Sequence, residues 1–266
     1  MAQAQARESG YAQHPDYDVH FEPCARRLRV VFNGETIADS TRAQYLFETR
    51  HLPVYYFPRE DVRMDLLERT GHSTFCPFKG TAGYFSVRAG DRVAENAVWT
   101  YEEPFPETAE IKDYLSFYWN RMDHWYEEDE EVFVHPRDPY SRIDIVASKR
   151  PVKVVVAGET VAETTDARFL FETGLPTRYY IPPADVRREL LQPSDTTSAC
   201  PYKGEARYWH LTLGDQRFED IVWAYPEPVA EAGRIKDLMC FFDEHVDAIY
   251  VDGQAMARPR TKWSRK

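Results

Sequence analysis

The chain has 266 residues, of which 43% are hydrophobic and 29% are charged, so it is long enough for one large domain or two of ordinary size with sizeable cores. Its formal net charge of −11 argues against a nucleic-acid partner, because phosphate neutralisation requires a basic surface. No apolar run approaches the roughly 18 residues that a membrane span needs, and the polar N-terminus has no apolar signal region. We therefore expect a cytoplasmic protein that binds neither nucleic acid nor a membrane.

The chain contains one long internal repeat. Identical residues recur at positions that differ by 124, among them the pairs Gly34/Gly158, Glu48/Glu172, Tyr56/Tyr180, Cys76/Cys200, Lys79/Lys203, Trp99/Trp223 and Asp123/Asp247. An interval kept over nearly the whole chain indicates two copies of one domain rather than a solenoid of short units. We assign residues 1–18 to an N-terminal tail, 19–134 to the first domain, 135–253 to the second domain and 254–266 to a basic C-terminal tail.

Each copy is expected to begin with a β-hairpin. In the first copy an apolar run over 29–32 leads into Asn33-Gly34, which supplies the positive φ that a tight turn demands. The second copy repeats the arrangement with an apolar run over 154–156 followed by Ala157-Gly158. The pattern predicts two antiparallel strands at the start of each domain.

Further strands are predicted from aromatic and β-branched segments. In the first copy these are residues 45–47, 55–57, 84–88 and 97–101, and in the second copy residues 208–213 and 221–225 correspond to the last two. Gly90-Asp91 and Gly214-Asp215 separate the final strands of each copy, and their composition is typical of turns. The strand content makes each domain mainly β.

Helices are predicted at two places in each copy. A short central helix is expected over 61–67 and 185–191, where Asp61 and Asp185 can cap the first turn. A longer terminal helix is expected over 111–125 and 235–249, because apolar residues recur there at helical spacing. The acidic run 127–131 is interpreted as a solvated helix end or linker, and the basic C-terminal residues Arg258, Arg260, Lys262, Arg265 and Lys266 as a solvated, mobile tail.

Four sequence elements, FETGLPTRYYIP, TSACPYKGEARYW, IVWAYPEP and HPRDPYSRID, resemble the domain family DUF427, and both copies match. The resemblance implies a β-tent (Mss4-like) fold of two small sheets that lean on one another. With the helices expected above, the predicted fold class is α+β, in two tandem β-tent domains. Zinc-binding proteins of this fold use paired Cys-x-x-Cys knuckles, which the chain lacks, so we expect no metal and no other cofactor.

Three residue types near the Cys-Pro-x-Lys-Gly element are candidates for chemistry. Lys203 could bind an anion, or act as a base once its pKa falls, and the alternative is a lysine whose head is solvated at the sheet surface. Cys200 is a candidate nucleophile, or else a buried inert cysteine; if its segment is extended, Lys203 points to the opposite face and cannot activate it. Glu172 ends an apolar strand, where a carboxylate could act as a general base.

The candidate ligand-binding set is Glu172, Arg178, Tyr180 and Lys203, with Glu48, Tyr56 and Lys79 as first-copy counterparts. Arg178 has the planar guanidinium suited to a carboxylate or phosphate, and Val54 stands at its place in the first copy. The alternative is a structural pair between Glu172 and Arg178. Tyr179 and Tyr180 should point to opposite faces of their strand, one into the core and one toward a pocket.

Three functions are compatible with these residues. The first is the binding of a small anionic or polar molecule in a pocket of the second domain, with catalysis left open. The second is nucleotidyl transfer, a name attached to the family in places; it requires carboxylates that hold Mg²⁺, and only Asp138 with Asp144 is a candidate pair. The third is a non-enzymatic interaction or scaffold module, which predicts a filled pocket and freely solvated Lys79 and Lys203.

Overall fold

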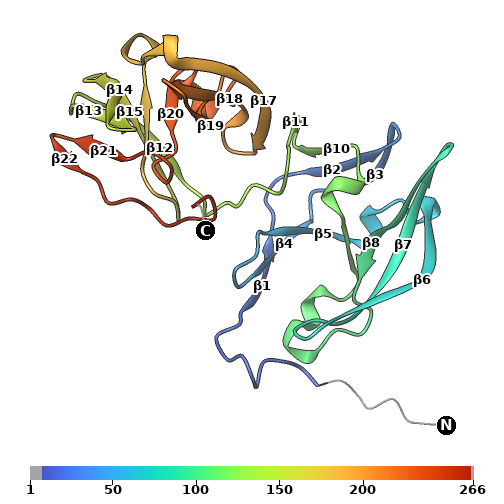
Figure 1. Ribbon diagram of the computed structural model, residues 1–266. Helices are drawn as coiled ribbons and strands as arrows, with labels where there is room; N and C mark the ends of the chain where they lie inside the picture. The colour runs from blue at the N-terminus through green and yellow to red at the C-terminus, as the bar shows by residue number, and fades with distance from the viewer. Residues whose placement is uncertain (1–7, 265–266) are drawn as a thin grey trace. The chain divides into compact units, whose positions relative to one another are not determined.

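The computed structural model describes residues 8–264 and divides into a first compact unit that ends at Asp138 and a second that begins at Pro139. Strands β1–β11 build the first unit and strands β12–β22 build the second, so both units are mainly β (Figure 1). Every helical segment within the described residues is a short 3₁₀ turn.

The strands of the first unit follow one another in close succession. They are β1 (Val19–Pro23), β2 (Leu28–Phe32), β3 (Glu35–Ser40), β4 (Gln44–Glu48), β5 (Val54–Pro58), β6 (Leu67–Cys76), β7 (Gly80–Ala89), β8 (Arg92–Thr100), β9 (Tyr114–Phe117), β10 (His124–Glu127) and β11 (Glu130–Glu131). Its 3₁₀ segments are η1 (Arg59–Asp61), η2 (Met64–Leu66), η3 (Pro106–Ile111) and η4 (Trp119–Arg121).

The second unit repeats this succession. Its strands are β12 (Ile143–Ser148), β13 (Val152–Val156), β14 (Glu159–Thr164), β15 (Ala167–Glu172), β16 (Arg178–Ile181), β17 (Leu191–Cys200), β18 (Gly204–Leu213), β19 (Gln216–Ala224), β20 (Met239–Phe241), β21 (Ala248–Val251) and β22 (Gln254–Ala255). Its 3₁₀ segments are η5 (Pro183–Asp185), η6 (Arg188–Leu190) and η7 (Ala230–Ile235).

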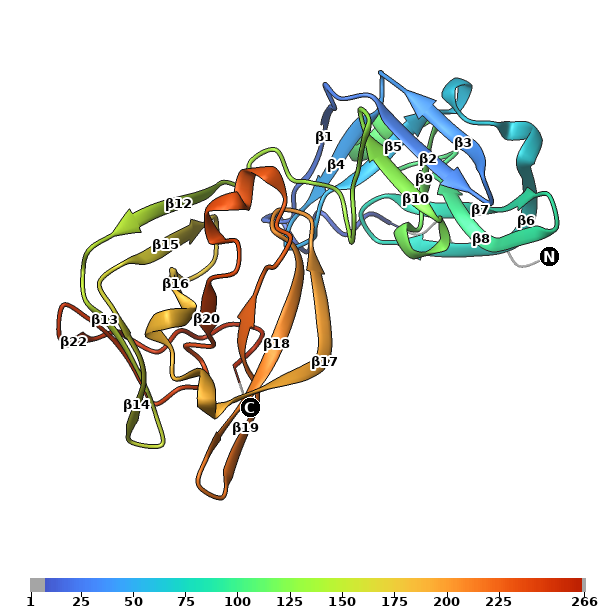
Figure 2. The same cartoon turned by 90° about the horizontal axis from the view of Figure 1, so that it is seen from above.

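Each unit contains one seven-stranded and one four-stranded antiparallel sheet. The large sheets have the orders β1-β4-β5-β9-β8-β7-β6 and β12-β15-β16-β20-β19-β18-β17, which match strand for strand. The small sheets have the orders β11-β10-β2-β3 and β22-β21-β13-β14. Figure 2 shows β17, β18 and β19 side by side in the second unit. The internal repeat of the sequence therefore corresponds to two copies of one topology.

The predicted hairpins are confirmed. Asn33 and Gly34 have φ values of 49° and 77°, and β2 pairs with β3 across them. Ala157 and Gly158 repeat this geometry with φ values of 49° and 79°. Alternation along the strands then separates two buried layers, so Tyr179 packs in the core shared by both sheets while Tyr180 packs on the opposite face of the large sheet.

The predicted helices are wrong. The central segments form pairs of 3₁₀ turns, η1 with η2 and η5 with η6, that lead straight into the long edge strands β6 and β17. In place of the first terminal helix the chain forms η3, β9, η4 and β10, and Asp113, at φ 66°, turns the backbone into β9. Residues of β9 are buried on both faces of the sheet, with Leu115 and Phe117 in one hydrophobic cluster and Tyr114 against another, and this imitates helical spacing.

The acidic run 127–131 departs from its predicted solvation at one residue, because residues 128–130 are exposed and Glu127 is buried. Glu127 is buried in β10, where its carboxylate accepts hydrogen bonds from the phenol of Tyr55 and, at 2.5 Å, from the guanidinium of Arg26. These two donors compensate the loss of hydration that burial of a carboxylate costs. The rest of the run forms β11 and the turn that precedes it.

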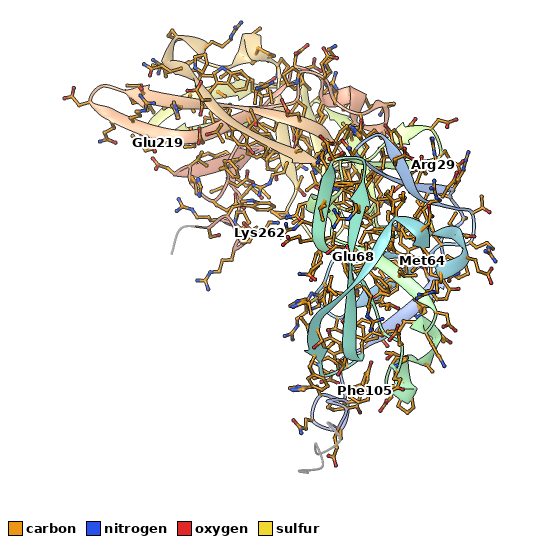
Figure 3. The ribbon with its side chains drawn as sticks, turned by 90° about the vertical axis from the view of Figure 1, so that its right-hand side faces the viewer. Arg29, Met64, Glu68, Phe105, Glu219 and Lys262 are labelled. Atoms are coloured by element: carbon orange, nitrogen blue, oxygen red, sulfur yellow. The ribbon has the colours of Figure 1, made fainter. Side chains whose placement is uncertain are left out.

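The C-terminal segment, residues 256–264, is largely exposed, as expected for a solvated tail, but it is hydrogen-bonded to the second unit. Thr261 Oγ1 donates to Glu244 Oε1 at 2.6 Å, and His245 Nε2 lies 2.8 Å from the carbonyl oxygen of Trp263. Lys262 lies in this segment (Figure 3), whereas Arg265 and Lys266 lie outside the described residues. Among residues 8–264, no helical segment has the length and apolar character needed to traverse a bilayer.

Candidate functional site

Lys203 is held in a tight turn between β17 and β18. Its backbone N–H donates to the carbonyl of Cys200 at 3.2 Å, and its own carbonyl accepts from Val229 at 3.2 Å. The next residue, Gly204, has a φ of 100°, and a Cβ there would lie 2.9 Å from the carbonyl oxygen of Glu227. Only glycine fits such a backbone without strain, which explains the Lys-Gly dipeptide. The segment is a turn, so the extended geometry considered for Cys200 and Lys203 does not apply.

The Lys203 ammonium forms an ion pair with the carboxylate that ends β15. Nζ lies 2.6 Å from Oε2 of Glu172, and each side chain exposes 11% of its surface. In the first unit Lys79 pairs in the same way with Glu48, at the end of β4, and both are equally buried. A charge-assisted hydrogen bond shielded from water is stronger than a surface ion pair. The structure thus brings Glu172 and Lys203 together and repeats the arrangement.

Two buried tyrosines, Tyr180 and Tyr225, lie close enough to Glu172 to feel its charge. The indole N–H of Trp223 donates to the phenol oxygen of Tyr180 at 3.1 Å, and both side chains belong to one buried cluster with Tyr225. Burial, with the nearby Cys200 and Glu172, raises the pKa of Tyr225. Burial likewise raises the pKa of Tyr180 well above its ordinary value. These phenols therefore stay protonated at neutral pH. The first unit has the same bond between Trp99 and Tyr56.

Arg178 belongs to a different ionic cluster. Its Nη2 and Nη1 donate to the two oxygens of Glu244 at 2.7 and 2.8 Å, and Nη1 lies 3.2 Å from Oδ1 of Asp243. The Glu244 side chain has no exposed surface and Arg178 is also buried. The partner of Arg178 is therefore Glu244 rather than Glu172, and its guanidinium is already fully engaged by acids.

The pKa values of the two acids in this cluster are shifted in opposite directions from their ordinary values. Burial raises the pKa of Asp243 to about 6, while hydrogen bonds from Arg178 and Thr261 outweigh burial and lower the pKa of Glu244 to about 2. Folding therefore takes up a proton at Asp243 between about pH 4 and 6, and the stability this adds is lost as pH rises through 6. The contribution of Glu244 is complete above pH 4.5 and is lost as pH falls toward 2.

Asp243→Asn is accordingly expected to change the pH dependence of stability. The wild-type second unit should lose about 2 kcal/mol of unfolding free energy between pH 4.5 and 7.5 from Asp243, and the variant should lose none of it, because an amide does not titrate. Urea unfolding at both pH values, followed by hydrogen exchange in peptides from β16, measures the difference. Asp215→Asn, in an exposed hairpin, is the control and should behave as wild type. Equal pH dependence in Asp243→Asn and wild type would contradict the assignment.

The N-terminal segment, residues 8–18, covers the ion pair of the first unit. The phenol of Tyr17 donates to Oε1 of Glu48 at 3.0 Å, and its ring stacks on Phe78 with centroids 3.5 Å apart. Gly10 N–H donates to the carbonyl of Pro77 at 2.7 Å, and Tyr11 contacts the edge of Phe78. The described part of the predicted N-terminal tail is thus anchored to the domain, and residues 1–7 lie outside the described residues.

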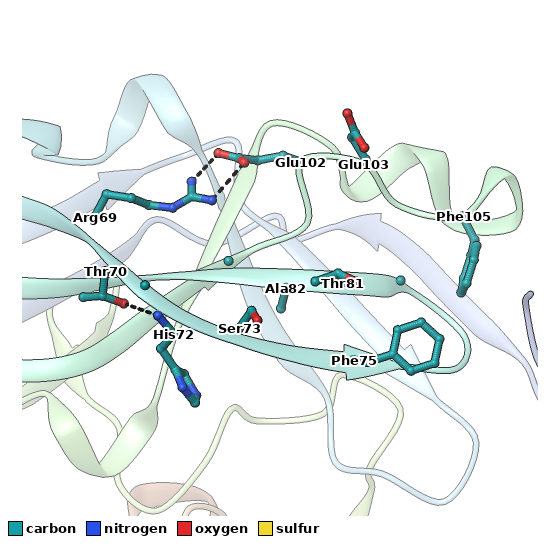
Figure 4. A pocket seen from close by; sticks show the side chains of 13 residues that line it. Arg69, Thr70, His72, Ser73, Phe75, Thr81, Ala82, Glu102, Glu103 and Phe105 are labelled. Atoms are coloured by element: carbon teal, nitrogen blue, oxygen red, sulfur yellow. Dashed lines mark hydrogen bonds and ion pairs between the residues drawn. The ribbon is translucent and has the colours of Figure 1, made fainter. Parts of the chain in front are cut away.

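A hollow of about 630 Å³ lies beside β6 and β7 of the first unit (Figure 4). Arg69 crosses its rim and binds Glu102 through two hydrogen bonds of 2.5 and 3.0 Å. Gly83 makes room for this guanidinium, since a Cβ at that position would lie 2.5 Å from Nη2 of Arg69. None of the residues predicted for the site lines this hollow.

Two other features bear on chemistry. All four cysteines are free, with Cys24 and Cys240 buried and Cys76 and Cys200 half-buried. Within residues 8–264 no three His, Cys, Asp or Glu side chains are grouped so that they could hold a metal ion.

The sequence missed Asp243 and Glu244 as partners of Arg178, although a signal was present. The first copy has Trp119 and Asn120 at the equivalent positions, and Val54 in place of Arg178. The cation and the two acids therefore occur together in the second copy and are absent together from the first copy. Tyr17 was also missed, because the second copy has Ser141 at its place and the repeat gives no match there.

Comparison with protein families gives one result. A family model described as NTP_transf_9, Domain of unknown function (DUF427), matches residues 20–128 and again residues 144–252. The two matches coincide with the two repeated sets of sheets. A search of curated proteins found no match.

Proposed function

The chain belongs to the DUF427 family over both of its halves, and from this starting point we propose that the second unit binds a small polar molecule at the Lys203–Glu172 pair. One observation carries the proposal: a buried ammonium and a buried carboxylate form an ion pair near two buried tyrosines, and the second oxygen of that carboxylate is not used by the lysine. Within the described residues, Oε1 of Glu172 receives no hydrogen bond, whereas Oε2 is taken by Lys203. Convergent polar groups in aromatic surroundings are what a small-molecule site needs.

The charges of the site favour a neutral polar ligand over an anion. Lys203 is neutralised by Glu172, and Arg178 is neutralised by Glu244, so neither cation is free for a phosphate or carboxylate. A ligand that donates a hydrogen bond to Glu172 gains a charge-assisted bond without displacing the lysine. The anionic ligand considered from the sequence is thereby the less favoured choice within the proposal.

The competing functions receive less support. A scaffold module predicts freely solvated Lys79 and Lys203, and each of them is only 8% exposed. Nucleotidyl transfer needs acids that converge on Mg²⁺, and Asp144 is instead engaged by Arg142 at 2.8 Å. We therefore propose a binding role and assign no reaction to Cys200, Glu172 or Lys203. A β-tent (Mss4-like) description suits the pair of sheets and belongs to the same proposal.

Equilibrium binding to a library of metabolites tests the role. Ligands that bind the wild-type chain are expected to bind Glu172→Gln and Lys203→Met about 10- to 100-fold more weakly. Glu172→Gln removes the negative charge of the acceptor, and Lys203→Met removes the ammonium that holds this carboxylate in place. Lys79→Met in the first unit is the matched control and should leave binding in the second unit unchanged. Glu172→Gln keeps the shape of the side chain and guards against a mere loss of folding. Full affinity in both second-unit variants would refute the proposal.

A further inference from the structure

We propose that the molecule bound by the second unit presents a phenol to Oε1 of Glu172, in the position that the Tyr17 side chain occupies in the first unit. The inference rests on the proposed function, because it names the ligand class of the same site. It also implies that the first site is occupied by its own N-terminal segment.

The first unit shows which hydrogen-bond donors the carboxylate of its ion pair can bind. Glu48 receives two donors at once, the ammonium of Lys79 at Oε2 and the phenol of Tyr17 at Oε1. Burial, together with the negative charge of Glu48, raises the pKa of Tyr17, so the phenol remains a donor at neutral pH. A phenol hydrogen bond to a carboxylate is charge-assisted, and the ring adds apolar contact.

The two units can be compared at this point because the neighbouring residue is placed in the same way in both. Asp18 exchanges hydrogen bonds with Thr49, the N–H donating to Oγ1 at 2.8 Å and the carbonyl accepting from the Thr49 N–H at 3.0 Å. Arg142 exchanges the same two bonds with Thr173, at 2.9 and 3.0 Å. The residue that precedes each of them therefore lies at an equivalent position.

That preceding residue is Tyr17 in the first unit and Ser141 in the second. A serine hydroxyl sits one carbon from the backbone and has no ring, so it cannot reach the carboxylate as a tyrosine does. Accordingly, Oε1 of Glu172 receives no hydrogen bond from any residue in the described range, while the rest of the pair is preserved. The second unit therefore keeps the carboxylate acceptor but has a serine at the position from which Tyr17 donates in the first unit.

A reciprocal exchange of the two residues tests the inference, with p-cresol as the probe and ¹H–¹⁵N NMR titration as the readout. The wild-type chain should bind p-cresol at one site, with shifts centred on Glu172 and Lys203. Ser141→Tyr should weaken this binding by about tenfold or more, since the new side chain fills the site. Tyr17→Ser should open a second site, with shifts at Glu48 and Lys79, and the double variant should bind in the first unit only.

Two comparison probes define the ligand class. Toluene keeps the ring and lacks the hydroxyl, and n-butanol keeps a hydroxyl and lacks the ring, so both should bind about tenfold or more weakly than p-cresol. Equal binding of toluene or n-butanol would overturn the phenol assignment, and so would p-cresol binding that Ser141→Tyr leaves unchanged. Circular dichroism of each variant establishes that it is folded.

The experiment separates the inference from the function on which it rests. If library ligands bind through Glu172 and Lys203 while p-cresol does not, the phenol inference fails and the proposed function stands. If neither library ligands nor p-cresol depends on these two residues, both fail together.

Discussion

Replacing Arg178 with methionine is expected to lower the free energy of unfolding of the second unit by about 3–5 kcal/mol. The variant leaves the carboxylate of Glu244, which has no exposed surface, without its two hydrogen bonds from the guanidinium. It also leaves Asp243 buried without a counter-charge. Urea unfolding followed by hydrogen exchange in peptides from each unit measures the loss, and the first unit should be unaffected because Val54 stands at the equivalent position.

Two further variants sharpen this prediction. Arg187→Met removes an arginine that is 44% exposed and pairs with Glu159 and Glu189, and it should cost less than about 1 kcal/mol. The triple variant R178V/D243W/E244N installs the residues of the first unit and should recover most of the lost stability, since an apolar replacement of a whole buried ionic group is often neutral. A loss below about 1 kcal/mol in Arg178→Met would show that the cluster is not the buried, coupled unit described above.

Gly204→Ala is expected to destabilise the second unit by about 2–5 kcal/mol and to displace Lys203. An alanine at φ 100° is strained, which costs on the order of 1–3 kcal/mol, and its Cβ would lie 2.9 Å from a backbone oxygen that cannot move without shifting the strand pairing. Thermal unfolding with unit-resolved hydrogen exchange measures the loss. Library ligands that bind the wild-type chain should bind this variant more weakly.

Gly214→Ala is the matched control for that result. Gly214 also has a positive φ, 54°, but a Cβ there would meet nothing within 4 Å. The control therefore isolates the backbone strain, which for this left-handed conformation is about 1–2 kcal/mol. If Gly204→Ala lowered the free energy of unfolding no more than Gly214→Ala does, the close approach of the Glu227 carbonyl would not affect stability. The Lys-Gly dipeptide would then need another explanation.

Local signals predicted the parts of the fold that local chemistry determines. The turn dipeptides at Asn33-Gly34 and Ala157-Gly158 are found where they were expected, because positive φ is a property of the turn itself. The interval between the copies predicted two domains of one topology, and the sheet orders agree. Aromatic runs such as residues 55–57 predicted strands correctly, since they pack on a sheet wherever it lies.

The features that the sequence did not reveal depend on partners far along the chain. β6 is a polar edge strand with little buried surface, so no apolar alternation marks it, and its pairing with β7 alone makes it a strand. β9 was mistaken for helix because Leu115 and Phe117 pack in one hydrophobic cluster while Tyr114 packs against another, so apolar residues occur on both faces of the strand. The partner of Arg178 lies 66 residues away, and a nearer acid, Glu172, invited the wrong pairing. The pairing of Glu172 with Lys203 could have been predicted from the sequence, because both residues recur at the repeat interval of 124.

The ionic cluster around Arg178 also affects how the tandem chain assembles. Neighbouring copies of one topology can misfold by exchanging equivalent strands during synthesis. If β16 replaced β5, its guanidinium would enter a domain that offers Trp119 and Asn120 where acids are needed, and Glu244 would be stranded without a cation. Each stranded charge costs several kcal/mol, so the mismatch penalises the swapped product. The cluster thus favours the pairing of β16 with the strands of its own domain over the exchanged arrangement.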